Sequence, residues 1–196
     1  MHEKTLSTND ITIKEDDLGL PFPRTWSEEL IAEWLQLKGY FVEVGVPISS
    51  GVRGGRNEAD IVGVRMQDGK AKIFRIEVGN LSGNPIDNAE MIKQKFSKQN
   101  QSDVLNYCRQ KLNFAPNQEI DYEQLYIAVW WSNKTFSYLE QQQLPVKELF
   151  DFIKTEIVPT IEKWKDNPPH RPQTKGKSIT LPEGMWLLYL VDYLLG

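Results

Sequence analysis

The sequence is nearly without cysteine and histidine, the side chains on which many metal and acid–base sites are built. Its 196 residues contain one cysteine, Cys108, and two histidines, His2 and His170. A single cysteine excludes an internal disulfide and a cysteine-based zinc site, and it fits a reducing compartment. So few histidines argue against a histidine-centred active site. The chemistry of this protein is therefore expected to rest on carboxylates and lysines.

Long apolar runs and an excess of positive charge are absent as well. The run that comes closest to a membrane span, 185–195, is shorter than the ~20 residues required and contains Asp192. The first 20 residues are polar, without the apolar segment of a secretion signal. We therefore expect a cytoplasmic protein without a membrane partner. The net charge of −4 argues against non-specific coating of nucleic acid but leaves room for a local basic surface.

What the sequence does contain is the composition of an ordinary globular protein, 40% hydrophobic and 26% charged. Its patterning predicts four parts: a polar arm at 1–24, an α/β domain at 25–166, a loop rich in proline and lysine at 167–180, and an apolar helix at 181–196. Two interpretations of the last helix stay open. It covers the sheet of its own chain, or it packs against a partner, for example in a homodimer.

Within the domain, the patterns follow the order helix, strand, strand, strand, helix, strand, helix. This order predicts an α/β fold with a mixed central sheet covered by helices and an antiparallel front half. Ser27 is the expected N-cap of the first helix, and Pro159 is expected to bend the last one. The predicted helices span 27–38, 86–112 and 146–164, and the predicted strands are 40–48, two runs within 57–80, and 123–131.

The dipeptide Asp68-Gly69 joins two of the predicted strands and sets their register. It is a strong signal for a two-residue hairpin loop, because a type I′ turn needs positive φ at both central residues. A loop of these two residues pairs Ile61 with Ile76 on one face. On the other face it places the carboxylates of Asp60 and Glu77 opposite each other, with Cβ atoms ~5 Å apart.

Two opposed carboxylates destabilise a sheet unless something offsets their repulsion. Three solutions are open: a shared proton, a protein cation such as Arg75, or a bound divalent metal, for which Mg²⁺ or Mn²⁺ is the expected ion. The alternative is that Asp60 is an edge or loop residue in a salt bridge with a nearby arginine.

Three segments together resemble the PD-(D/E)xK nuclease superfamily, nearest to its archaeal Holliday-junction resolvase and Mrr-like branches: "SEELIAEWLQLKGYFV", "EADIVGV" and "FRIEVGN". The resemblance implies a restriction-endonuclease-like α/β core and Mg²⁺-dependent hydrolysis of nucleic-acid phosphodiesters. By this likeness Asp60 and Glu77 would be the metal ligands, and Glu28 or Glu29 of the first helix would approach the metal. The two helix glutamates are explained equally well as favourable charges at a helix N-terminus.

The sequence departs from the family motif at Gly79, where the family has a lysine. That lysine is thought to orient or polarise the attacking water, which glycine cannot do. Lys93 and Lys95 of the following helix, or Arg75, are the candidate replacements, and each is also explained as a solvated or salt-bridged side chain. The chain is thus expected to be a metal-dependent nuclease with a relocated lysine or a catalytically inactive nuclease-fold module that binds nucleic acid or a protein.

The expected partner is nucleic acid, DNA rather than RNA. Arg53 and Arg56, in the glycine-rich loop 49–57, and Arg75 are the candidate phosphate contacts, since guanidinium groups suit phosphate oxygens. Ordinary solvation explains the two loop arginines equally well. Trp130 and Trp131 end the fourth predicted strand and are interpreted as core residues rather than as stacking platforms for bases.

Overall fold

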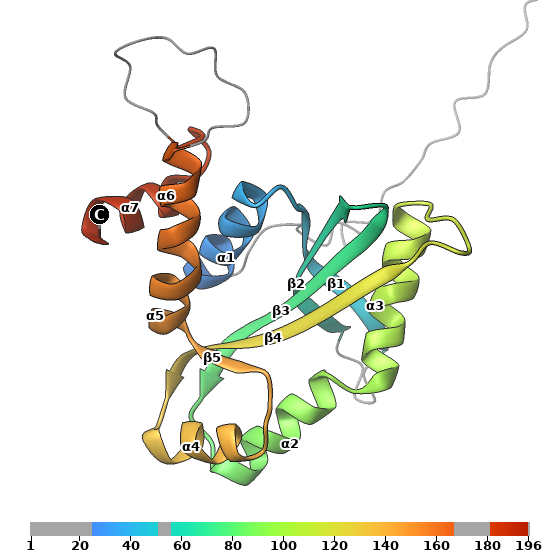
Figure 1. Cartoon of the computed structure of the whole chain (residues 1–196). Helices are drawn as coiled ribbons and strands as arrows, with labels where there is room; N and C mark the ends of the chain where they lie inside the picture. Colours follow the sequence, from blue (N-terminus) through green and yellow to red (C-terminus); the bar gives the residue numbers. More distant parts are fainter. Residues whose placement is uncertain (1–24, 51–55, 167–180, 196) are drawn as a thin grey trace, which may run out of the picture.

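The computed structural model describes residues 25–50, 56–166 and 181–195. A five-stranded mixed sheet crosses the molecule, with its strands in the order of the sequence (Figure 1). The first three strands are antiparallel and the last two run parallel to the third, so the predicted mixed sheet with an antiparallel front half is confirmed. The strands are β1 (Phe41–Ser50), β2 (Arg56–Gln67), β3 (Lys70–Leu81), β4 (Ile120–Trp131) and β5 (Val146–Glu148).

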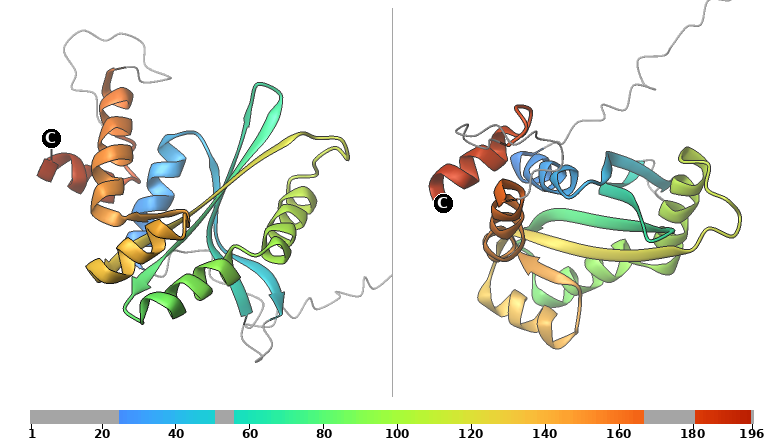
Figure 2. Two further views of the ribbon diagram at one scale, coloured as in Figure 1. Left: turned by 60° about the horizontal axis from the view of Figure 1, so that its bottom comes forward. Right: turned by 45° about the horizontal axis from the view of Figure 1, so that its top comes forward.

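Helices cover both faces of this sheet (Figure 2). One face is covered by α1 (Trp26–Leu37) and α6 (Val158–Asp166), on which α7 (Trp186–Leu195) packs in turn, and the other by α2 (Pro85–Lys95), α3 (Lys98–Lys111) and α4 (Asn133–Gln141). The N-cap of α1 lies two residues before the expected position. Thr25, rather than Ser27, is the N-cap, because its hydroxyl accepts from Glu28 N at 3.2 Å while the Glu28 carboxylate accepts from Thr25 N at 3.3 Å.

The helix predicted at 86–112 is two helices. Ser97 caps α3 by accepting from Asn100 N at 3.4 Å, and the Asn100 amide donates to the carbonyls of Gln94 and Lys95 at 2.9 and 3.1 Å. These side-chain bonds satisfy the backbone groups that a continuous helix would have paired, so the chain can turn between α2 and α3. As a result α2 ends at Lys95.

The region predicted as a helix at 146–164 begins as a strand, β5. It continues through α5 (Leu149–Phe152), a π-helical turn (Ile153–Ile157) and then α6. Pro159 lies just after the π-helical turn, where its ring and missing N–H disfavour ordinary α-helical bonding to the residue four before it. The short helix α4 and β5 escaped prediction, since neither is long enough to show a clear periodicity.

The C-terminal helix α7 packs on its own chain. Leu187 and Leu188 are buried in the cluster formed with α1, and their N–H groups donate to the Glu33 carboxylate at 3.3 and 2.9 Å. Tyr193, 85% exposed, marks an outer face that no described residue covers, so a homodimer through this helix remains a prediction. Among the described helices, none combines the length and apolar character that a membrane span requires.

Candidate active site

The β2–β3 hairpin forms with the predicted turn and register. Asp68 and Gly69 have φ of 52° and 79°, and paired residues run without a shift from Gln67–Lys70 to Ile61–Ile76. The ladder stops there, one pair before Asp60 and Glu77, so the direct pairing expected for these acids does not form. Instead the Asp60 carboxylate turns to the backbone and accepts the N–H of Val78 at 2.8 Å.

Glu77 is a fully buried carboxylate held by two cations. Its Oε1 accepts from Arg75 Nε at 2.9 Å and from Arg75 Nη2 at 2.7 Å, and the ammonium of Lys95 contacts its Oε2. Arg75 and Glu77 are both 0% exposed, whereas the Lys95 side chain is 32% exposed. The buried negative charge of Glu77 is therefore compensated by the buried guanidinium of Arg75 and, from the surface, by the ammonium of Lys95 at the end of α2.

The repulsion between the two carboxylates changes the pKa of Asp60. Burial and then the charge of Glu77 raise the pKa of Asp60 to about 7, with Glu28 adding to the rise, while Lys95 and the Val78 N–H oppose it. Asp60 is thus partly protonated near neutral pH. Of the three solutions expected for the acid pair, the structure shows protein cations on Glu77, and the raised pKa of Asp60 favours a proton on that residue.

The first helix brings one of its two candidate glutamates to this site. Glu28 is 8% exposed and lies near enough for its charge to act on Asp60. Glu29, the other glutamate expected to approach the metal and a candidate catalytic residue, instead accepts a bond of 3.0 Å from the Trp186 indole N–H. This contact directs Glu29 to α7, so of the two expected glutamates Glu28 is the one whose charge reaches Asp60.

The two candidate lysines of α2 have different partners. Lys95 contacts Glu77, whereas the Lys93 ammonium donates to the Gln142 side chain at 3.2 Å on an exposed part of the surface. Two residues apart on a helix, the side chains point in different directions. Lys95 alone of the pair belongs to the acid cluster.

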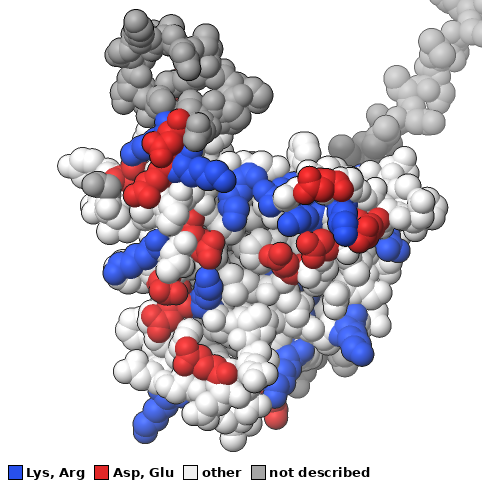
Figure 3. Space-filling model, viewed as in Figure 1, with Lys and Arg blue, Asp and Glu red and all other residues white. Residues whose placement is uncertain are grey.

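Among the predicted nucleic-acid contacts, the prediction for Arg75 needs correction. Its side chain is fully buried against Glu77, so a phosphate at the surface cannot reach it. Arg53 lies outside the described residues, as does the side chain of Arg56. The face seen in Figure 3 carries interspersed charges of both signs, without a broad basic area. Trp131 packs near Phe136, with ring centres 6.2 Å apart, but Trp130 is 68% exposed, contrary to its prediction as core.

Tyr126 is a site residue that the sequence did not reveal. It pairs with Glu77 across the parallel β3–β4 ladder, and its hydroxyl oxygen would lie 2.7 Å from a Cβ added at Gly79. Burial and the charges of Asp60 and Glu77 raise the pKa of its hydroxyl. Finding Tyr126 requires the β3–β4 register, which the long connection through α2 and α3 leaves undetermined in the sequence.

A divalent cation is compatible with the donors gathered here. Among the described residues, no three His, Cys, Asp or Glu side chains form a ready-made metal cage. Asp60 and Glu77 nevertheless supply carboxylate oxygens, which Mg²⁺ and Mn²⁺ prefer, and one or two carboxylates suffice when water and phosphate complete the shell. After the larger effect of burial, the charge of Glu77 adds to the rise in the pKa of Asp60, so the protein cations leave part of that negative charge uncompensated. A cation at Glu77 would have to share Oε2 with Lys95 or displace it.

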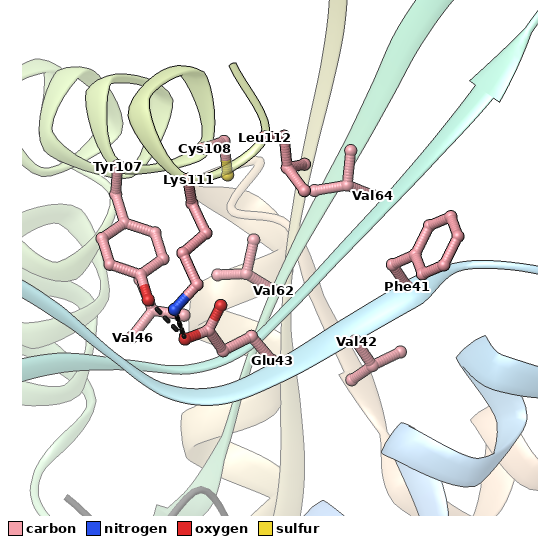
Figure 4. A pocket seen from close by; sticks show the side chains of 10 residues that line it. All are labelled: Phe41, Val42, Glu43, Val46, Val62, Val64, Tyr107, Cys108, Lys111 and Leu112. Atoms are coloured by element: carbon pink, nitrogen blue, oxygen red, sulfur yellow. Dashed lines mark hydrogen bonds and ion pairs between the residues drawn. The ribbon is translucent and has the colours of Figure 1, made fainter. Parts of the chain in front are cut away.

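Two hollows lie elsewhere. The larger, of about 470 Å³, is bordered by Trp34 and Phe152, and its Lys147 and Glu156 form an ion pair of 3.0 Å. The smaller, of about 70 Å³, lies between α3 and strands β1 and β2 (Figure 4). There the Glu43 carboxylate is contacted by the Tyr107 hydroxyl and Lys111, and burial raises the pKa of the Cys108 thiol to about 12. The thiol of the smaller hollow is therefore not an activated nucleophile.

Comparison with known proteins leaves this cluster as the main guide to function. No family model matches the sequence, and no curated protein matches it either. The interpretation therefore depends on what two acids, a lysine and a tyrosine at one end of a sheet can do chemically.

Proposed function

We propose that the protein is a metal-dependent nuclease with a restriction-endonuclease-like core, which hydrolyses phosphodiester bonds of nucleic acid, DNA rather than RNA. The observation that carries this proposal is the contact of Lys95 with buried Glu77 beside Asp60. Two carboxylates and one lysine from β2, β3 and α2 are the groups that the resemblance predicts, with the lysine supplied by a helix instead of by position 79. The preference for DNA rests on the resemblance alone.

Each residue has a definite task in this proposal. Bound to Asp60 and Glu77, Mg²⁺ or Mn²⁺ would lower the pKa of a water molecule and offset charge on the phosphate. Asp60 would lose its proton when the cation binds, because the cation favours the carboxylate form. Arg75 holds Glu77 in one orientation through two hydrogen bonds. Lys95 is partly exposed, so its ammonium can donate to the attacking water or to a phosphate oxygen as negative charge develops.

The contact of Lys95 with Glu77 favours an active enzyme over an inactive binding module. Gly79 supported the inactive module because it removes the motif lysine. However, the Tyr126 hydroxyl occupies the space next to Gly79, and Lys95 brings an ammonium to the same acid from another direction. The protein would therefore be an inactive binding module only if the folded wild-type protein cleaved no substrate.

Cleavage of labelled duplex DNA, single-stranded DNA and RNA, with Mg²⁺ and with EDTA, tests the proposal. Wild-type protein should cleave in Mg²⁺, and Asp60→Asn should be inactive. Lys95→Met should slow cleavage by about 10²–10³-fold, the loss typical of a removed electrostatic stabiliser. Lys93→Met is the matched control on the same helix and should retain wild-type rates. No cleavage of any substrate by folded wild-type protein would contradict the proposal, as would equal rates for the two lysine variants.

A further inference from the structure

Gly79 is a glycine for reasons of space rather than of backbone conformation. The glycines with positive φ in the described chain are Gly39, Gly45 and Gly69, and Gly79 is not among them. A Cβ at position 79 would lie 2.7 Å from the Tyr126 hydroxyl oxygen and 3.6 Å from the ring carbon that bears it. The first distance is shorter than real Cβ contacts, so a side chain at position 79 and the hydroxyl of Tyr126 exclude each other.

The ring of Tyr126 is firmly anchored. Tyr126 is 3% exposed and packs in a cluster with Ala89 and Ile92 of α2 and Leu139 of α4. Within the part of the chain that the structure describes, no hydrogen bond to its hydroxyl is found. This hydroxyl lies close enough to Asp60 and Glu77 to feel both charges. An anchored donor thus adjoins the acid pair with its hydrogen-bonding capacity unused.

We propose that Tyr126 is a substrate-binding residue of this site, whose hydroxyl donates to an oxygen of the phosphate group held beside Asp60 and Glu77. The inference rests on the proposed function, and it assigns to β4 a contact that neither β2, β3 nor α2 supplies. A neutral donor suits this position, because it binds a phosphate oxygen without adding a third cation that would compete for Glu77. A tyrosine hydroxyl is protonated at neutral pH, and a hydrogen bond to a charged oxygen is about twice as strong as a neutral one.

The first test measures binding of a fluorescently labelled DNA duplex by anisotropy, with Ca²⁺ in place of Mg²⁺. Tyr126→Phe should weaken binding about tenfold, as expected for loss of one charge-assisted hydrogen bond. Tyr122→Phe is the matched control: Tyr122 lies on the same strand, but its hydroxyl is buried beside Arg75. That variant should bind as wild type does.

The second test needs no ligand. Gly79→Ala should lower Tm by about 5 °C in metal-free buffer, the size expected for an overpacked methyl group in a protein of this length. In the Tyr126→Phe background, where the clashing oxygen is gone, the same change should lower Tm by less than half as much. Equal effects in the two backgrounds would contradict the mutual exclusion and overturn the inference.

The outcomes separate this inference from the proposed function. Binding without cleavage in Mg²⁺ contradicts the proposed activity and supports Tyr126 as a phosphate contact if Tyr126→Phe binds more weakly. Cleavage by wild type with equal binding by both tyrosine variants overturns the inference and leaves the activity standing. No binding by wild-type protein overturns both.

Discussion

Charged side chains are exposed near the turn of the β2–β3 hairpin and buried at its far end. Near the turn, Lys70 pairs with Glu119 at 2.5 Å, and both side chains are largely exposed. At the far end, Arg75 and Glu77 form their ion pair with no exposed surface at all. Exposed pairs are screened by water and contribute little, whereas burying two charges costs free energy that the rest of the fold must offset. Such an arrangement is typical of functional sites, so the far end is where function should be sought.

The largest expected difference between the two ends is in stability. Glu77→Gln leaves the buried guanidinium of Arg75 without its counter-charge and should lower the free energy of unfolding by about 3–5 kcal/mol. Glu119→Gln is the matched change at the turn end and should have no measurable effect. Urea unfolding in metal-free buffer measures both. Similar losses in the two variants would remove the distinction between the ends.

The next effect is the pH dependence that Asp60 confers on the metal-free protein. Its folded pKa of about 7 lies above the ordinary value of 3.8, so the unfolded chain releases this proton first as pH rises. Stability should therefore fall between about pH 4 and 7, by up to about 1.4 kcal/mol per pH unit, and level off above that range. Asp60→Asn can still accept the Val78 N–H, and it should remove this fall and raise Tm at pH 8.

Asp121 provides the control for this titration at the turn end. It pairs with Lys72 at 3.8 Å and is half exposed, and Asp121→Asn should leave the pH dependence in place. If Asp60→Asn is instead less stable than wild type at pH 8, the carboxylate of Asp60 is a structural partner and its repulsion with Glu77 is minor.

A smaller effect is expected when Lys95 is removed from the acid pair. Because its ammonium contacts the same Glu77 oxygen that a metal would need, Lys95→Met should tighten Mn²⁺ binding by about threefold to tenfold, roughly 1 kcal/mol. Lys93→Met should leave the affinity unchanged, since Lys93 bonds Gln142. Weaker Mn²⁺ binding by Lys95→Met would show that Lys95 does not compete with the metal.

The smallest effect on the metal site is expected from a change at the turn itself. Gly69 has φ of 79°, and an added Cβ would have no atom within 4 Å. Gly69→Ala should therefore cost only backbone strain, about 1 kcal/mol, with Mn²⁺ affinity unchanged. Gly79→Ala is the converse case, in which space rather than φ sets the cost. A loss of metal binding in Gly69→Ala would mean that the turn controls the far end.

The parts that were predictable from the sequence are those set by local chemistry. Asp68-Gly69 fixes a register that the structure follows as far as Ile61–Ile76. That register could not show that the ladder ends before Asp60, because the bond from Val78 N to the carboxylate replaces the next pair. Nor could helical periodicity show the break at Ser97, which depends on side-chain bonds to the backbone and decides where Lys95 lies. The position of Tyr126 beside Glu77 could not be predicted, because parallel strand pairing leaves no short-range signal in the sequence.

Calorimetric titration of Mn²⁺ into wild-type protein and into Asp60→Asn tests the central claim most directly. The claim is that Asp60 and Glu77 form a metal site, and that protein cations and a proton reduce their mutual repulsion in the metal-free protein. It predicts binding by wild-type protein, with release of a proton near pH 7, and no binding by Asp60→Asn. Absence of binding in both proteins, or equal binding in both, would contradict it.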